Sequence, residues 1–119
     1  MGDLETCMES LKRDLAKALI SSDIFASDGL SLLSYNSQEA AAAFFSELSV
    51  QMREALGSSA LPQIQDYYLI ELEEKSLVLV LCDNEFMWSM LIDGRQLSLG
   101  MLLNVIIPKY LKAFKAVVS

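Results

Sequence analysis

The stretch DIFASDGLSLLSY, residues 23–35, places one Asp-Gly pair between two short apolar runs. An Asp-Gly pair favours a two-residue type I′ turn, because both central residues of that turn adopt a positive φ. We therefore predict a β-hairpin over residues 22–35, with Asp28-Gly29 as its turn and with Phe25 and either Leu32 or Leu33 in the core. Because segments that predict helices precede and follow it, the hairpin points to an α+β fold.

Residues 2–19, which precede the hairpin, repeat apolar side chains at intervals of three and four. This spacing predicts an amphipathic helix. Asp3 is its expected N-cap, because an aspartate side chain can accept a hydrogen bond from the free N–H groups of a first helical turn.

The segment 36–57, which follows the hairpin, predicts a second and longer helix. Asn36 and Glu39 resemble a capping box at its start, and Gly57 is a natural stop at its end. Its apolar arc is wider than the roughly 100° that suffices to cover one side of a sheet, so we expect it to contact a second surface. The apolar residues that form this arc include Ala41, Phe44, Phe45, Leu48 and Met52.

Residues 64–93 predict three more strands joined by short turns at 73–75 and 83–85, so neighbouring strands should run antiparallel. The middle strand, SLVLVLC at 76–82, is a continuous apolar run, which is typical of a strand covered on both faces. Trp88 in the next strand should be buried, with a partner for its indole N–H. In the first of these three strands, alternate residues should share one face: Tyr68, Ile70 and Leu72.

Residues 97–118 predict a third helix, and Pro108 should kink or break it because proline lacks the N–H that bonds four residues back. The expected element order is αββαβββα over a single domain, residues 1–119. The two hairpin strands and the three later strands should form a five-stranded antiparallel sheet with helices on both faces, an α+β fold.

Composition argues against several classes of function. The 119-residue chain is 53% hydrophobic with a net charge of −7, so neither nucleic acid nor an anionic membrane surface is an expected partner. The sequence has no histidine, no phosphate-binding glycine loop and no metal-binding cysteine spacing, so we expect no enzyme activity, no metal and no cofactor. Cys7 and Cys82 should be reduced core residues. Without a signal peptide or a membrane-inserting segment, the protein should be cytoplasmic.

Four stretches, taken in order, resemble the Roadblock/dynein light chain family. SSDIFASDGLSLLSYNS (21–37) is similar to that family's first hairpin, and EAAAAFFSELSVQMREAL (39–56) resembles its Ala-rich second helix. DYYLIELEEKSLVLVLCDN (66–84) is similar to its third and fourth strands, and WSMLIDGRQLSLGMLL (88–103) to its fifth strand and last helix. The resemblance covers nearly the whole chain and implies a Roadblock-like, profilin-like layered fold.

The resemblance also implies a function: a non-enzymatic regulator or scaffold that binds a Ras-like small GTPase, as proteins of the MglB kind do. Members of the family form homodimers, or heterodimers with a related chain, by pairing their second helices and their edge third strands. Carried onto this sequence, the implied dimer interface comprises Ala41, Phe44, Phe45, Leu48, Met52, Tyr68, Ile70 and Leu72.

Two other functions stay open at the level of sequence. A small, acidic, dimeric chaperone of the type III secretion kind shares the acidity and the α+β pattern. That class usually places three strands before its second long helix, whereas two are predicted here. A small-molecule sensor domain is the other alternative, because an apolar pocket leaves no sequence motif.

Overall fold

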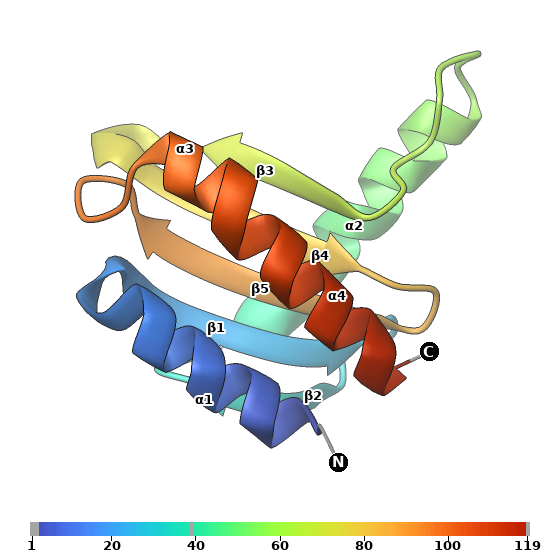
Figure 1. The fold of residues 1–119 in the computed structure, drawn as a ribbon. Coiled ribbons are helices and arrows are strands. Elements are labelled where there is room, and N and C mark those ends of the chain that lie inside the picture. The colour runs from blue at the N-terminus through green and yellow to red at the C-terminus, as the bar shows by residue number, and fades with distance from the viewer. Residues whose placement is uncertain (1–2, 39, 119) are drawn as a thin grey trace.

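A computed structural model describes residues 3–38 and 40–118, and a five-stranded antiparallel sheet forms its centre (Figure 1). The strands lie in the order β2-β1-β5-β4-β3, so β2 and β3 form the two edges. Each neighbouring pair is antiparallel, which confirms the predicted sheet and the α+β class. The strands are β1 (Leu19–Ala26), β2 (Ser31–Tyr35), β3 (Tyr67–Glu71), β4 (Ser76–Cys82) and β5 (Phe86–Asp93).

Helices cover both faces of the sheet, as predicted (Figure 1). α1 and α4 lie on one face, whereas α2 crosses the other face and projects beyond the sheet on the side of β3. The helices are α1 (Leu4–Leu15), α2 (Ala41–Gly57), α3 (Leu99–Met101) and α4 (Ile107–Val118), and a π-helical turn at Leu102–Ile106 joins the last two.

The larger hydrophobic core lies between the sheet and the pair α1 and α4. Trp88 of β5 is fully buried there, and its ring centroid lies 5.9 Å from that of Tyr110 and 5.7 Å from that of Phe114. Its indole N–H donates a hydrogen bond to the hydroxyl of Ser22. The prediction of a buried tryptophan with a satisfied N–H is confirmed.

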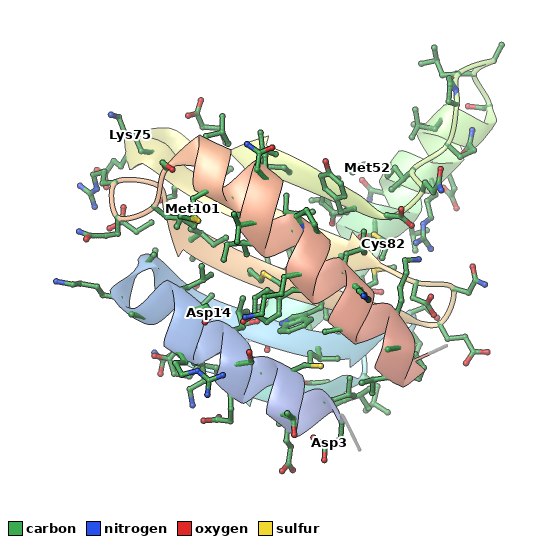
Figure 2. All side chains as sticks on the ribbon, in the orientation of Figure 1. Asp3, Asp14, Met52, Lys75, Cys82 and Met101 are labelled. Carbon is green, nitrogen blue, oxygen red and sulfur yellow. The ribbon has the colours of Figure 1, made fainter. Side chains whose placement is uncertain are left out.

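A polar contact at the surface of this core joins α1 to α4. The carboxylate of Asp14, labelled in Figure 2, accepts hydrogen bonds from the ammonium of Lys109 and the hydroxyl of Tyr110. The Tyr110 hydroxyl also lies 2.9 Å from the hydroxyl of Ser10. Two residues of α4 are thus held by two residues of α1.

The smaller core lies on the α2 side of the sheet. It contains Phe25, which is buried as predicted, together with inward-facing side chains of β4 and β5. Among the apolar side chains that α2 packs against this core, Ala42 is fully buried. Phe45, Leu48 and Met52 stay partly exposed. This face of the sheet is therefore the less completely covered of the two.

The hairpin β1–β2 is present, but the predicted two-residue turn is wrong. The N–H of Gly29 bonds to the carbonyl of Ala26, and the N–H of Ala26 bonds to the carbonyl of Leu30. Ser27 and Asp28 therefore occupy the centre of the turn, and Gly29 follows with φ of +91°. A type I turn followed by a left-handed glycine is the common three-residue hairpin connection. This connection also uses the Asp-Gly pair, but only the glycine has a positive φ, whereas the predicted type I′ turn needs a positive φ at two residues.

α1 begins where the sequence indicates, because the Asp3 side chain accepts a 2.7 Å hydrogen bond from the N–H of Thr6. It ends at Leu15, one turn earlier than predicted. The chain bends at Ala16, whose φ is +48°, and Leu19 already belongs to β1.

α2 begins at Ala41 rather than at Asn36. Asn36 and Ala40 have φ of +50° and +64°, so the chain bends there instead of entering a helix. The predicted capping partner Glu39 lies outside the described residues. The end of the helix at Gly57 agrees with the prediction.

The last helix passes through Pro108 without a break. At Leu102–Ile106 it widens into a π-helical turn, in which the N–H of Ile107 bonds to the carbonyl of Leu102. Pro108 follows directly, so the wider turn accommodates the missing N–H that was predicted to kink or break the helix.

Candidate functional site: an apolar groove beside an open sheet edge

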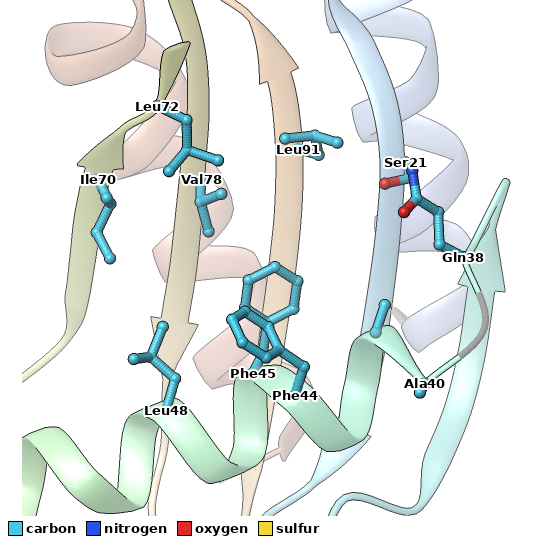
Figure 3. Close-up of a pocket in the computed structure, with 11 residues that line it drawn as sticks. Ser21, Gln38, Ala40, Phe44, Phe45, Leu48, Ile70, Leu72, Val78 and Leu91 are labelled. Carbon is cyan, nitrogen blue, oxygen red and sulfur yellow. The ribbon is translucent and has the colours of Figure 1, made fainter.

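An apolar groove of about 430 Å³ lies between α2 and the strands beside it, and we call it the α2 groove (Figure 3). Ser21 and Gln38 stand at one end of the groove, where they supply its polar side chains. The large apolar side chains that line it are Phe44, Phe45 and Leu48 of α2, Ile70 and Leu72 at β3, Val78 of β4 and Leu91 of β5.

The groove is open because α2 rests on the sheet through small side chains. Ala42, Ser46 and Ser49 are the buried residues of the helix. The hydroxyl of Ser46 donates to the carbonyl of Ser27 at 2.8 Å, and the hydroxyl of Ser49 lies 2.8 Å from that of Tyr68. The large apolar side chains of α2 are left beside this contact, where they border the groove.

Two aromatic rings dominate the wall of the groove on α2. Phe44 and Phe45 form an edge-to-face pair with ring centroids 5.3 Å apart. Phe45 is half-buried, whereas Phe44 is 60% exposed. A large exposed aromatic within a continuous apolar surface is typical of a protein interaction site.

The edge strand β3 borders the groove. It pairs with β4 alone, so within residues 3–38 and 40–118 its outer backbone groups have no strand partner. Ile70 of β3 is half-buried, and Leu72, one residue beyond the strand, is 47% exposed. An unpaired edge next to an apolar groove can bind another chain both by backbone hydrogen bonds and by apolar contact.

The structure brings most of the predicted interface residues together. Met52 lies away from the groove, half-buried against the smaller core. Tyr68 is buried beneath α2, where burial raises the pKa of its hydroxyl and Ser49 partly offsets that effect. The predicted residues that line the α2 groove are Ala41, Phe44, Phe45, Leu48, Ile70 and Leu72.

The sequence did not indicate the strand residues that form the floor of the groove. The alternation of side chains along β4 and β5 is consistent with Val78 and Leu91 facing α2. Their position beside Ile70, however, follows from the strand order β5-β4-β3, which the sequence does not give. The serines of α2 were also missed, because serine is usually read as a solvent-facing residue of a helix.

The site offers apolar contact rather than reactive groups. Burial raises the pKa of the Cys7 and Cys82 thiols, which favours their unreactive, protonated form. Across the described part of the chain, no group of three or more potential ligand side chains could hold a metal ion. None of the helices in that part is both long enough and apolar enough to span a bilayer.

No protein-family model and no curated protein matches this chain by sequence. Solved structures do resemble it. MglB of Myxococcus xanthus superimposes with a TM-score of 0.72 at 13% identity, over 90% of this chain and 87% of that one. A Roadblock/LC7 domain from Streptomyces avermitilis has a TM-score of 0.69 at 16% identity, over 96% of both chains. An MglB structure described as having a tetrameric arrangement has a TM-score of 0.74 at 12% identity, over 94% of this chain and 87% of that one.

At these identities the likeness establishes the fold. The chain has the Roadblock-like fold that the sequence resemblance implies, with two strands before its second helix and three after it.

Proposed function

We propose that this chain is a non-enzymatic regulator or scaffold that assembles with a second copy of itself and binds a Ras-like small GTPase. One observation carries the proposal: the α2 groove and the open β3 edge adjoin on a Roadblock-like fold. These are the elements through which the sequence resemblance implies that dimers form.

The geometry suits a two-fold dimer. Pairing β3 with the same strand of a second copy would continue the sheet and satisfy the outer backbone groups of Tyr67–Glu71. The same axis would bring the exposed Phe44 rings and the two α2 grooves to one face of the joined sheet. A stable interface of this kind buries about 800 Å² on each partner, which a strand edge together with a 17-residue helix can supply.

Support for the GTPase as partner comes from the fold and from the sequence resemblance to regulators of the MglB kind. Two joined copies would present one composite surface, and the GTPase would dock on that surface. The acidic net charge of −7 argues against nucleic acid as an alternative partner.

The structure bears differently on the two alternative functions, the secretion chaperone and the small-molecule sensor. A type III secretion chaperone is disfavoured, because two strands rather than three precede α2. A small-molecule sensor would use the α2 groove itself, whose walls are mostly apolar. A dimer whose α2 grooves cover each other would leave no room for a ligand, so dimerisation that depends on Phe44 would count against the sensor.

Sedimentation equilibrium tests the dimer. At about 50 μM we expect the wild-type chain to be dimeric, since a modest affinity in the micromolar range suffices at that concentration. Phe44→Glu should produce monomers. Val50→Glu is the matched control, because Val50 is an exposed apolar residue of α2 that does not line the groove. Ile70→Pro should also produce monomers, by removing a backbone donor from β3.

A wild-type chain that stays monomeric at this concentration would defeat the homodimer and favour a heterodimer with a related chain. Calorimetric titration with Ras-like GTPases of the source organism, loaded with GDP or with a non-hydrolysable GTP analogue, tests the second step. No binding to any of them in either state would defeat the regulator proposal while leaving the dimer intact.

A further inference from the structure

β2 is the second open edge of the sheet, at the opposite end from β3 (Figure 1). Its neighbour is β1, and Figure 3 shows it as the outermost strand beside β1. Among the residues that the structure describes, no other strand pairs with its outer side.

The strand β2 itself lacks the side chains that usually prevent strands from pairing, and a charged group beside it is the ammonium of Lys12 of α1, 4.8 Å from the ring centroid of Tyr35. Residues 29–38 contain no charged residue and no proline, whereas natural edge strands commonly carry lysine or proline. Two leucines are exposed instead: Leu30 at 63% and Leu32 at 43%. An uncharged edge with exposed apolar side chains favours the addition of another strand.

A β-bulge shapes the edge. Ile24 pairs with Leu33 and Phe25 pairs with Ser31, so Leu32 is an extra residue of β2 with no partner on β1. A bulge interrupts the alternation of side chains along a strand. Leu32 and Leu33, although adjacent in sequence, therefore line the same groove.

That groove lies between β2 and the neighbouring ends of α1 and α4, and we call it the β2 groove. Leu4 of α1 and Val117 of α4 complete its apolar lining, and Asp3 and Glu5 supply its acidic side chains. The groove therefore combines an apolar floor with negative charge, directly beside an open strand edge.

We propose that the β2 edge binds an extended segment of a partner protein that carries apolar and basic side chains on one and the same face, at every second residue. The segment adds to the sheet as a sixth strand through backbone hydrogen bonds. On the face that meets α1 and α4, its apolar side chains enter the β2 groove and a basic side chain pairs with Asp3 or Glu5. The bulge leaves a short regular edge beyond Leu32, which fits a short extended segment better than a long strand. The proposal is independent of the α2 groove and of the GTPase.

Binding of a defined probe tests the proposal. The probe is a capped decapeptide with threonine at every second residue and with valine and lysine in turn at the residues between, so that valine and lysine share one face. Its titration is followed by the backbone amide resonances of the isotope-labelled protein. We expect saturable shifts at Leu33, Ser34 and Tyr35. N-methylation of alternate peptide bonds in the probe should weaken binding at least tenfold, because it removes the backbone donors. Replacing its lysines with glutamates should also weaken binding at least tenfold.

Two variants of the protein distinguish the effect of blocking the β2 groove from the general effect of an added positive charge. Leu32→Lys should weaken binding of the probe at least tenfold, because Leu32 lines the β2 groove. Val50→Lys adds the same charge at an exposed residue of α2, which lies on the other face of the sheet and outside the β2 groove, so it should change binding less than threefold.

Three results would overturn the proposal. The first is the absence of binding at millimolar probe. The second is binding that N-methylation or Leu32→Lys leaves unchanged. The third is self-association of the protein that Leu32→Lys abolishes and Phe44→Glu does not, which would assign the β2 edge to a second copy of this chain.

Discussion

The hydroxyl of Ser22 accepts a 2.7 Å hydrogen bond from the indole N–H of Trp88. The same hydroxyl donates a 2.8 Å bond to the carbonyl of Ser89, so one serine of β1 satisfies two buried groups of β5. Ser22 and Trp88 are both buried, so neither bond is open to solvent. This contact explains how the chain keeps a polar indole nitrogen inside its larger core.

We predict that Ser22→Ala lowers the free energy of unfolding by about 1–3 kcal/mol, because it leaves the indole N–H without its acceptor. Denaturant unfolding followed by tryptophan fluorescence measures the change. Ser37→Ala is the control, since Ser37 is exposed and its hydroxyl donates to the carbonyl of the next residue, Gln38. A loss below about 0.5 kcal/mol for Ser22→Ala would contradict the assigned role of the bond.

Gly29→Val should destabilise the hairpin by about 2 kcal/mol, because a β-branched residue resists a φ of +91°. A Cβ by itself would fit at Gly29, since it would meet its nearest neighbour, the Cα of Ala43, at 3.5 Å, so the expected cost comes from the backbone conformation. Thermal unfolding monitored by circular dichroism tests the prediction. Gly57→Ala, at the end of α2, should change stability by less than about 1 kcal/mol. An unchanged melting temperature for Gly29→Val would refute the left-handed turn.

Gly94→Ala should destabilise the protein for a steric reason. A Cβ at Gly94 would lie under 3.0 Å from the carbonyl oxygen of Lys75, and that carbonyl accepts the N–H of Gly94 at 2.8 Å. Backbone atoms on both sides cannot move apart without breaking this bond, so we expect a loss of about 1–3 kcal/mol. Gly100→Ala is the matched control, because its Cβ would meet only a side-chain atom at 4.0 Å. Equal unfolding midpoints for the two variants would refute the argument.

The contact between Asp14 and α4 should make stability depend on pH. Hydrogen bonds from Lys109 and Tyr110 hold the pKa of the Asp14 carboxyl below its usual range. The folded state then binds the proton more weakly than the unfolded state, so the stabilisation is complete above the unfolded pKa of about 4 and is lost as the pH falls through the lowered folded value. Burial raises the pKa of Tyr110, so its hydroxyl remains a donor at neutral pH.

Asp14→Asn should therefore be less stable than wild type at pH 7, by less than about 1 kcal/mol because the pair is partly exposed. The difference should shrink as the pH falls from about 4 towards 2. Urea unfolding at a series of pH values measures it. Glu9→Gln serves as the control, since Glu9 pairs on the exposed side of α1 with Lys12. A difference between Asp14→Asn and wild type that is the same at every pH would show that the carboxylate charge contributes nothing.

Hydrophobic spacing was sufficient to predict the elements of this fold but not all of their ends. The run at 76–82 predicted a strand covered on both faces, and Leu77 to Cys82 are buried. The Asp-Gly pair predicted a hairpin, yet two kinds of turn use that pair, and their choice depends on the pairing of Ala26 with Leu30. Pro108 indicated an irregular helix but not the form of the irregularity. The helix contains a π-helical turn that keeps both Leu102 and Ile106 buried, and this form could be predicted only from the packing of the core.

The sequence predicted the part of the α2 groove that one element, α2, forms by itself. The wide apolar arc of α2 indicated an uncovered face, and Phe44 is exposed on it. The floor was not predictable, because it depends on which strands are neighbours. Ser46 and Ser49 show a further limit: small polar residues can form the buried side of a helix when each hydroxyl finds a carbonyl acceptor.

The two open edges also bear on the size of any assembly. Copies joined at β3 are related by one two-fold axis, and copies joined at β2 would be related by another at the far end of the sheet. Because a sheet twists, these axes are not parallel, and two axes that do not intersect generate a screw displacement, so a chain that used both would grow into an open helical ribbon instead of a closed particle. The extra residue Leu32 makes the two ends unlike, since β3 pairs regularly with β4 over five residues while β2 is interrupted after Ser31. The bulge at Leu32 therefore disfavours the regular strand pairing between copies at β2 that such a ribbon would require.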